Sequence, residues 1–173
     1  MALFKFEGKI PNVDKGSYVS ESAEVIGDVQ IGASCYIGPG AVLRGDFGSI
    51  TIGSYSAIEE HCIVHARPDC SCEIGEHVTV GHGAIVHNAV VADYVSIGMG
   101  AVVSNDAKIG NWSIIGEGCV VRTGQEVPAE KVVVGVPGKV VGDITEDQRE
   151  FWTRGKKVYA DLAKRCLDGL EKI

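Results

Sequence analysis

Residues 91–121 read VADYVSIGMGAVVSNDAKIGNWSIIGEGCVV and carry the pattern that decides the fold. An aliphatic side chain recurs at every sixth position, and a small or β-branched side chain stands two positions before each one. Residues two apart in an extended strand point the same way, so each unit of six places one side chain of each kind inside. The aliphatic positions are Val91, Ile97, Val103, Ile109, Ile115 and Val121.

The same period extends toward both ends of the chain. It begins at Val13 and ends at Val127, with short insertions after Leu43 and Val64 and one step of five residues before Val91. Glycine often follows the aliphatic residue, and glycine tolerates the dihedral angles that a tight turn demands. A strand and a turn repeated at fixed length predict a solenoid, in which each coil packs on its neighbours.

This pattern resembles that of the hexapeptide-repeat proteins over about residues 13–140. The resemblance implies a mainly β fold, a left-handed parallel β-helix of triangular section with three units in each coil. Its handedness is implied by the resemblance, because periodicity alone does not fix it. We expect this solenoid to span residues 1–142.

Residues 143–173 depart from the repeat and predict one amphipathic C-terminal α-helix packed on the β-helix. Thr145 and Gln148 have the spacing of a capping box at its start. The apolar stripe of this helix must lie on the solenoid or on a neighbouring chain. Its members are Phe151, Gly155, Val158, Tyr159, Leu162, Cys166 and Leu170.

Composition excludes several classes of protein. The formal net charge of −7, without a basic stripe, argues against a nucleic-acid surface. Neither a signal peptide nor an apolar run long enough to span a membrane is expected. The six cysteines are predicted to be reduced thiols in the cytoplasm. Four of them fall at the small inward position and are expected to be buried: Cys35, Cys62, Cys72 and Cys119.

Counting units of the repeat predicts where three histidines lie relative to one another. His65 and His87 each follow an inward valine, and they lie one coil apart when the insertions are counted as loops. Strands of neighbouring coils are about 4.8 Å apart, so both imidazoles can reach one metal ion.

Arg44 lies one coil below His65 on the same face. His82 lies on the preceding face, with Glu59 one coil below it, so it can share the ion only across an interface between chains. Three-fold packing would create three such sites, so we predict a homotrimer.

Several short stretches resemble the γ-class carbonic anhydrases and their close homologues. They are Leu43-Arg44-Gly45-Asp46, Val64-His65-Ala66, Gly81-His82, Val86-His87 and Ile97-Gly98-Met99-Gly100. The resemblance implies that zinc is bound by His65 and His87 of one subunit and by His82 of the next. It also implies an Arg44–Asp46 ion pair across the interface, which serves assembly or catalysis. Hydroxide on the metal would then hydrate CO₂ to bicarbonate. Imidazole also suits iron and cobalt.

The chain departs from the active members of that family before its first histidine. Ala57, Glu59 and Glu60 stand where those proteins carry Asn, Gln and Asp. A carboxylate at Glu59 would raise the pKa of metal-bound water or act as a base itself. The long acidic loop is also shortened here, so Glu60 or Glu73 is a candidate proton shuttle. His61 and His77 are expected at the surface. Tyr159 is expected in core or helix packing, with contact to the site as the alternative.

Two other functions fit the same pattern. Many hexapeptide-repeat proteins transfer acyl groups from CoA thioesters with a histidine as general base, and some homologues hydrolyse such thioesters. Those transferases usually extrude a long loop, whereas the insertions here are short. The remaining alternative is a metal-binding assembly subunit without enzymatic activity. The enzyme prediction is therefore a carbonic anhydrase, with CoA-thioester chemistry as its alternative.

Overall fold

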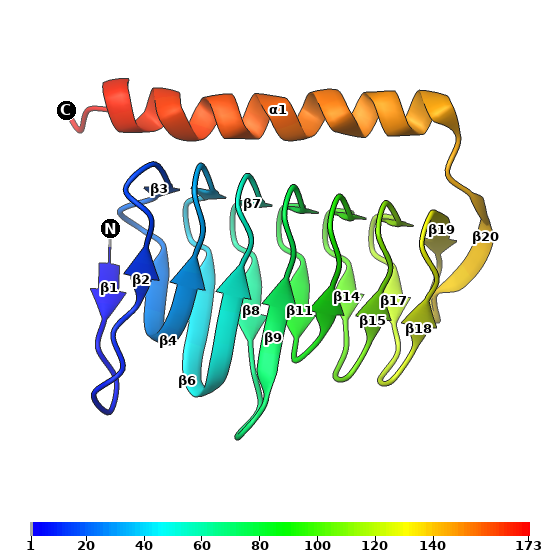
Figure 1. Cartoon of the computed structure of the whole chain (residues 1–173), viewed down its shortest axis with the longest axis horizontal. Helices are drawn as coiled ribbons and strands as arrows, with labels where there is room; N and C mark the ends of the chain where they lie inside the picture. The colour runs from blue at the N-terminus through cyan, green and yellow to red at the C-terminus, as the bar shows by residue number, and fades with distance from the viewer. Residues whose placement is uncertain (1) are drawn as a thin grey trace.

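The computed structural model describes residues 2–173 and shows a column of parallel coils with one long helix along its side (Figure 1). The strands form an eight-stranded and a twelve-stranded sheet, in which consecutive coils pair strand upon strand. The predicted left-handed parallel β-helix with a C-terminal helix is thus confirmed.

Three faces make up the column. The first contains β3 (Tyr18–Val19), β5 (Tyr36–Ile37), β7 (Ala57–Ile58), β10 (Thr79–Val80), β13 (Ser96–Ile97), β16 (Ile114–Ile115), β19 (Lys131–Val134) and the antiparallel β20 (Lys139–Asp143). The second contains the start of β6 (Val42–Ile52), then β8 (Ile63–His65), β11 (Ile85–His87), β14 (Val102–Val103) and β17 (Val120–Val121). The third contains the end of β6, then β9 (Ser71–Ile74), β12 (Val90–Val91), β15 (Lys108–Ile109) and β18 (Glu126–Val127). At the N-terminal end, β4 (Glu24–Ile31) pairs with β6, β1 (Ala2–Phe4) and β2 (Asn12–Val13).

The core is the interior of the triangle. The inward aliphatic residues from Ile31 to Val127 are buried and form one continuous cluster, which Val19 and Val25 extend toward the N-terminal end. All six cysteines are free thiols, and the four at the small inward position are buried as predicted. Burial raises the pKa of the Cys62 thiol to about 12 and that of Cys72 to about 11, so both are packing groups and not nucleophiles.

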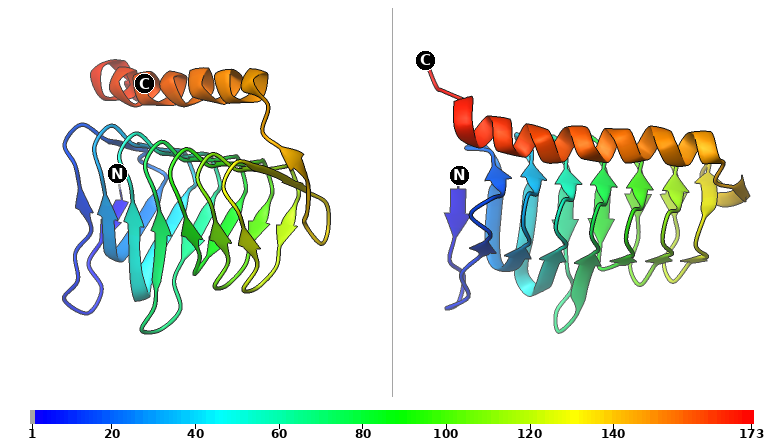
Figure 2. Two further views of the ribbon diagram at one scale, coloured as in Figure 1. Left: turned by 45° about the vertical axis from the view of Figure 1, so that its right-hand side comes forward. Right: turned by 45° about the horizontal axis from the view of Figure 1, so that its top comes forward.

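The helix α1 (Glu146–Gly169) begins with the predicted capping box. The hydroxyl of Thr145 accepts from the backbone N–H of Gln148, and the Gln148 side chain accepts from the backbone N–H of Thr145. The helix runs back over the coils, so that the C-terminus lies near the N-terminal end of the column (Figure 2). It packs on β3, β5 and β7, so the surface it covers belongs to its own solenoid.

The predicted apolar stripe of α1 is partly wrong. Tyr159, Leu162 and Cys166 pack on the solenoid, but three stripe members, Phe151, Val158 and Leu170, are exposed. The two buried residues of the helix are Lys156 and Ala163. The face of α1 that packs on the solenoid therefore includes a lysine. A search for apolar residues at helical spacing does not find such a residue.

A column of stacked rings lies at one corner of the triangle. The rings of Tyr55, His77, Tyr94 and Trp112 stack in sequence, with centroids 4.9, 4.6 and 4.4 Å apart. The Arg149 guanidinium covers the Trp112 ring at 4.4 Å and ties the start of α1 to this column. His77 is therefore a packed residue and not the surface residue we predicted, whereas His61 is exposed.

No helix within residues 2–173 is long and apolar enough to cross a membrane. The cytoplasmic location stays a prediction.

Candidate functional site

The second face of the column aligns Arg44, His65 and His87. The strand register pairs Arg44 with His65 and His65 with His87, so the predicted row of three is confirmed. Nδ1 of His65 lies 3.0 Å from Nε2 of His87. The two imidazoles therefore turn one nitrogen each toward the other.

The other ring nitrogens are held by oxygen atoms of the same chain. Nε2 of His65 lies 3.1 Å from Oδ1 of Asp46, and Nδ1 of His87 lies 2.5 Å from Oδ1 of Asn105. Arg44 donates to Oδ2 of Asp46 at 2.5 Å. This ion pair forms within one chain; the pair across an interface that the family resemblance implied stays a prediction. Arg44 and Asp46 are two positions apart on β6, so their side chains project from the same side of the strand.

The charges of this group follow from burial and hydrogen bonds. Burial alone would raise the pKa of Asp46, but the hydrogen bonds from Arg44 and His65 outweigh it and lower that pKa. Burial also lowers the pKa of His65, and Asp46 opposes that effect only in part. At neutral pH a neutral His65 donates its Nε2 proton to an ionised Asp46. Its Nδ1 then carries a lone pair that faces His87.

This pair fits a divalent metal ion. Two nitrogens of a tetrahedral zinc site, each about 2.0–2.1 Å from the ion, lie roughly 3.3 Å apart. The 3.0 Å between the two ring nitrogens is close to that separation. Carboxylate or amide oxygens on the outer nitrogens are the usual partners of metal-binding histidines. Within residues 2–173 of one chain, no three His, Cys, Asp or Glu side chains converge as a metal site. The third histidine from another chain stays a prediction.

His82 belongs to a second group at the edge of the first face. Its Nε2 lies 3.1 Å from Oε2 of Glu59, and its Nδ1 lies 2.5 Å from Oε2 of Glu60. We expected Glu59 one coil below His82, but the pairing of Ile58 with Val80 places Glu60 directly below it. Both carboxylates nevertheless contact the ring, which is 48% exposed.

Two tyrosines contact these carboxylates. Tyr36 donates to Oε1 of Glu60 at 2.8 Å, and the Tyr159 hydroxyl of α1 interacts with Glu59. Burial raises the pKa of Glu59, which the contacts with Tyr159 and His82 offset only in part. Glu60 is more open, and the hydrogen bonds from Tyr36 and His82 outweigh its burial and lower its pKa. Glu59 therefore takes up a proton more readily than its neighbour Glu60.

Sequence reasoning did not find Asn105 or Tyr36. We expected Tyr159 in core or helix packing, with contact to the site as the alternative; its tilted ring packs on Tyr36 at 5.5 Å between ring centroids, and its hydroxyl also reaches Glu59. Asn105 gave no signal, because it lies in a turn one coil away from the histidine it contacts. It stands 18 residues after His87, one position more than the coil of 17 residues that the pairing of Val86 with Val103 defines, and this nearness was the available clue. Ala57 is buried beneath α1, away from solvent.

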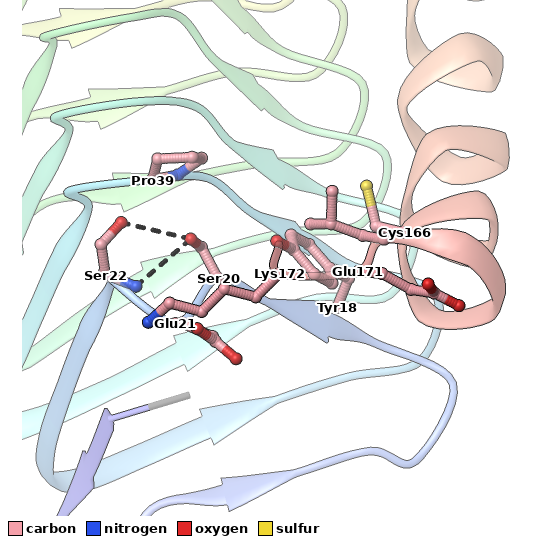
Figure 3. Close-up of a pocket in the computed structure, with 9 residues that line it drawn as sticks. Tyr18, Ser20, Glu21, Ser22, Pro39, Cys166, Glu171 and Lys172 are labelled. Carbon is pink, nitrogen blue, oxygen red and sulfur yellow. Dashed lines mark hydrogen bonds and ion pairs between the residues drawn. The ribbon is translucent and has the colours of Figure 1, made fainter.

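A separate hollow of about 420 Å³ lies between the first coils and the C-terminal end of α1 (Figure 3). Ser20, Ser22, Cys166 and Lys172 line it, and Ser20 and Ser22 are hydrogen-bonded to each other. None of the predicted site residues lines this hollow.

The stacked units of six, three to a coil, and the flanking helix define a hexapeptide-repeat protein. Residues 88–123 match the family model described as bacterial transferase hexapeptide (six repeats). The fold also matches two solved structures over 94% of this chain. One is a proposed acetyltransferase of Bacillus cereus, with TM-score 0.93, 27% identity and 95% of that chain covered. The other is a hexapeptide transferase family protein of Anaplasma phagocytophilum, with TM-score 0.89, 29% identity and 96% covered.

Curated relatives narrow the family further. The carnitine operon protein CaiE of Salmonella agona is 40% identical over 173 residues, which are 99% of this chain and 87% of that protein. CaiE of a Proteus strain is 36% identical over 98% of this chain and 86% of its own length. The chain belongs to the hexapeptide-repeat family of CaiE homologues. The γ-class carbonic anhydrase-like resemblance fits this membership.

Proposed function

We propose that this protein is an enzyme that transfers the acyl group of a CoA thioester to water or to another small nucleophile. The observation that carries the proposal is the half-exposed His82 ring with a carboxylate on each nitrogen. The similarity to two proteins described as transferases, at 27% and 29% identity, supports it. The carbonic anhydrase reaction has no such support from the relatives.

His82 has the arrangement of a general base. Ionised Glu60 accepts the Nδ1 proton at 2.5 Å, which favours the tautomer with a lone pair on Nε2. A nucleophile that takes the place of Glu59 beside Nε2 loses its proton to the ring. Glu60 then stabilises the imidazolium that forms.

In the acyl transfer, His82 first takes a proton from the nucleophile and then gives it to the leaving group. The nucleophile's oxygen or nitrogen bonds to the thioester carbonyl carbon, and the carbon–sulfur bond breaks. The CoA thiolate leaves with the electron pair of that bond and takes the proton back from the imidazolium. Buried Glu59, whose pKa is raised, can hold a proton beside the ring without adding charge.

A metal-dependent reaction is the second candidate, and the 3.0 Å contact between His65 and His87 favours it. In this proposal His65 and His87 of one subunit and His82 of its neighbour hold zinc, iron or cobalt in a homotrimer. Such an ion supplies Lewis-acid activation of water or of a carbonyl group. CO₂, hydrated to bicarbonate, is then the substrate, and Asp46 and Asn105 orient the two histidines. A metal-binding assembly subunit would hold the same ion without turnover.

The two candidates differ in an assay of the purified protein. We expect release of CoA thiol from acetyl-CoA, and we expect His82→Ala to abolish it. His61→Ala is the matched control, because His61 is exposed and lies outside both groups. CO₂ hydration by zinc- or iron-loaded protein is measured beside it. CO₂ hydration without thiol release would reject the acyl-transfer proposal and favour the metal enzyme. Bound metal with neither activity would favour the assembly subunit.

A further inference from the structure

Asn105 contacts the metal-facing pair of histidines from one coil away. It follows β14, the strand that pairs with β11, and its Oδ1 lies 2.5 Å from Nδ1 of His87. An amide oxygen can only accept a hydrogen bond, so this contact requires the His87 proton on Nδ1. Nε2 of His87 is then a lone pair, and it points at Nδ1 of His65.

The turn that carries Asn105 is held in place by its neighbour Asp106. The Asp106 carboxylate accepts from Arg67 at 2.9 and 3.0 Å and from the Asn88 side chain at 3.0 Å. The backbone N–H of Asp106 also donates to the Asn88 carbonyl at 2.7 Å. These bonds tie the turn to the two coils that carry His65 and His87. The position of Asn105 relative to His87 is therefore fixed by the fold.

We propose that Asn105 is a positioning residue that keeps the proton of His87 on Nδ1, so that Nε2 and the His65 Nδ1 face one divalent cation together. The inference rests on the proposed metal site. Two neutral imidazoles with lone pairs 3.0 Å apart repel each other unless a cation or a proton lies between them. Asn105 on one side and Asp46 on the other create that arrangement.

The opposite arrangement is chemically possible and would close the site. If the Asn105 side chain presented its NH₂ group, the His87 proton would move to Nε2 and bond to His65 directly. That closed pair has no lone pair of His87 left for a metal ion. Asparagine can adopt either orientation, whereas aspartate can only accept. Substitution of Asn105 by Asp therefore keeps the His87 proton on Nδ1. Substitution by Ala removes the acceptor, so neither tautomer of His87 is favoured.

The test measures zinc affinity by competition with a chelator in the intact protein. We expect Asn105→Ala to bind zinc about 10- to 100-fold more weakly. Asn105→Asp is expected to bind at least as tightly as the wild type. Asn111→Ala and Asn111→Asp are the controls, because the Asn111 side chain accepts from the backbone N–H of Asp93 in a turn away from these histidines. Unchanged zinc affinity in Asn105→Ala, or equal losses in Asn105→Ala and Asn105→Asp, would overturn the inference.

Nitrogen-15 NMR of the histidine rings gives a second readout that does not need the metal. In zinc-free wild type above pH 8 we expect the His87 proton on Nδ1, and in Asn105→Ala we expect a mixture of tautomers. A wild-type protein with the proton on Nε2 would overturn the inference. Wild type that takes up no zinc but shows the Nδ1 tautomer would reject the proposed metal site and support the role of Asn105.

Discussion

The side-chain nitrogen of Lys156 lies 2.9 Å from the carbonyl oxygen of Val95, beneath the helix that carries the lysine. Ser96 accepts from the same nitrogen at 2.9 Å and Thr79 at 3.4 Å, so each N–H of an ammonium group has an acceptor. No carboxylate lies within salt-bridge distance of it in residues 2–173, and burial lowers the pKa of Lys156 to about 7 although Glu59 opposes the shift. Protonation of this amine is therefore linked to the docking of α1.

The first prediction is a pH-dependent stability that Lys156 causes. The unfolded lysine titrates near pH 10.4, so between pH 7 and that value the unfolded chain binds more protons than the folded one. Its contribution to the free energy of unfolding therefore rises with pH, by about 1 kcal/mol between pH 6 and 8. Replacement by methionine removes this dependence, so the free energy of unfolding of the wild type minus that of Lys156→Met should increase by about 1 kcal/mol when the two, measured by urea unfolding, are plotted from pH 6 to 8. Parallel curves would contradict the prediction.

The same lysine explains why the face of α1 could not be predicted from sequence. Burial follows the line of Lys156, Tyr159 and Ala163, which contains one charged and one small residue. Phe151 and Val158 have the larger apolar side chains but point to solvent. Which line faces inward depends on the polar groups of Thr79 and Ser96 that receive the amine. Those groups belong to strands far away in sequence.

The second prediction concerns the repeat itself. Ile97 is fully buried in the central coil, and its truncation to alanine leaves a cavity among neighbours held by two adjacent coils. We expect Ile97→Ala to lower the free energy of unfolding by about 2–5 kcal/mol. Val141→Ala, at an exposed position of β20, is the control and should change it by less than about 0.5 kcal/mol. Denaturant unfolding followed by circular dichroism makes the comparison.

The part of the site that lies on paired strands could be predicted from the sequence, because counting repeat units shows which strands are neighbours. The count of three units in each coil places His65 above Arg44 and below His87, once the two insertions are treated as loops within a unit. The unit count does not say which turn or helix side chains bond to the site, so Asn105 was not found and the Tyr159 contact was only an alternative. The register at His82 was missed by one position, because that histidine stands in a turn and not in a strand.

The third prediction tests the roles of the two carboxylates beside His82. Glu60→Gln removes the charge that stabilises the imidazolium, and we expect kcat for thioester cleavage to fall about 10²- to 10⁴-fold with little change in KM. Glu24→Gln, at an exposed position of β4, is the matched control. A loss that appears only in KM would place Glu60 in substrate binding.

The fourth prediction concerns Glu59 and depends on the second candidate function. A buried carboxyl group beside a metal-facing histidine adds negative charge when it ionises, which disfavours the loss of a proton from water on the ion. Glu59→Gln removes that charge, so CO₂ hydration by zinc-loaded protein near neutral pH should increase. Stopped-flow measurement with a pH indicator follows the rate. An unchanged rate would show that Glu59 is remote from the reacting water.

The fifth prediction tests whether the second face is an interface between chains. Ile63 precedes the pair Val64–His65 on β8 and is 43% exposed, so a subunit that brings its His82 to this face would cover it. Light scattering of the wild type should give about 55 kDa, the mass of a trimer of 18.3-kDa chains. Ile63→Glu buries a charge in that interface, and we expect it to yield folded monomers that no longer retain zinc.

Val90→Glu is the control for that experiment, because Val90 is 41% exposed on the third face, outside the predicted interface. It adds the same charge at an aliphatic site of similar exposure, and we expect the trimer and its metal content to persist. Dissociation by Val90→Glu alone would move the interface to the third face. Zinc bound with full affinity by the Ile63→Glu monomer would show that one chain completes the site, so His82 of a neighbour would have no part in it.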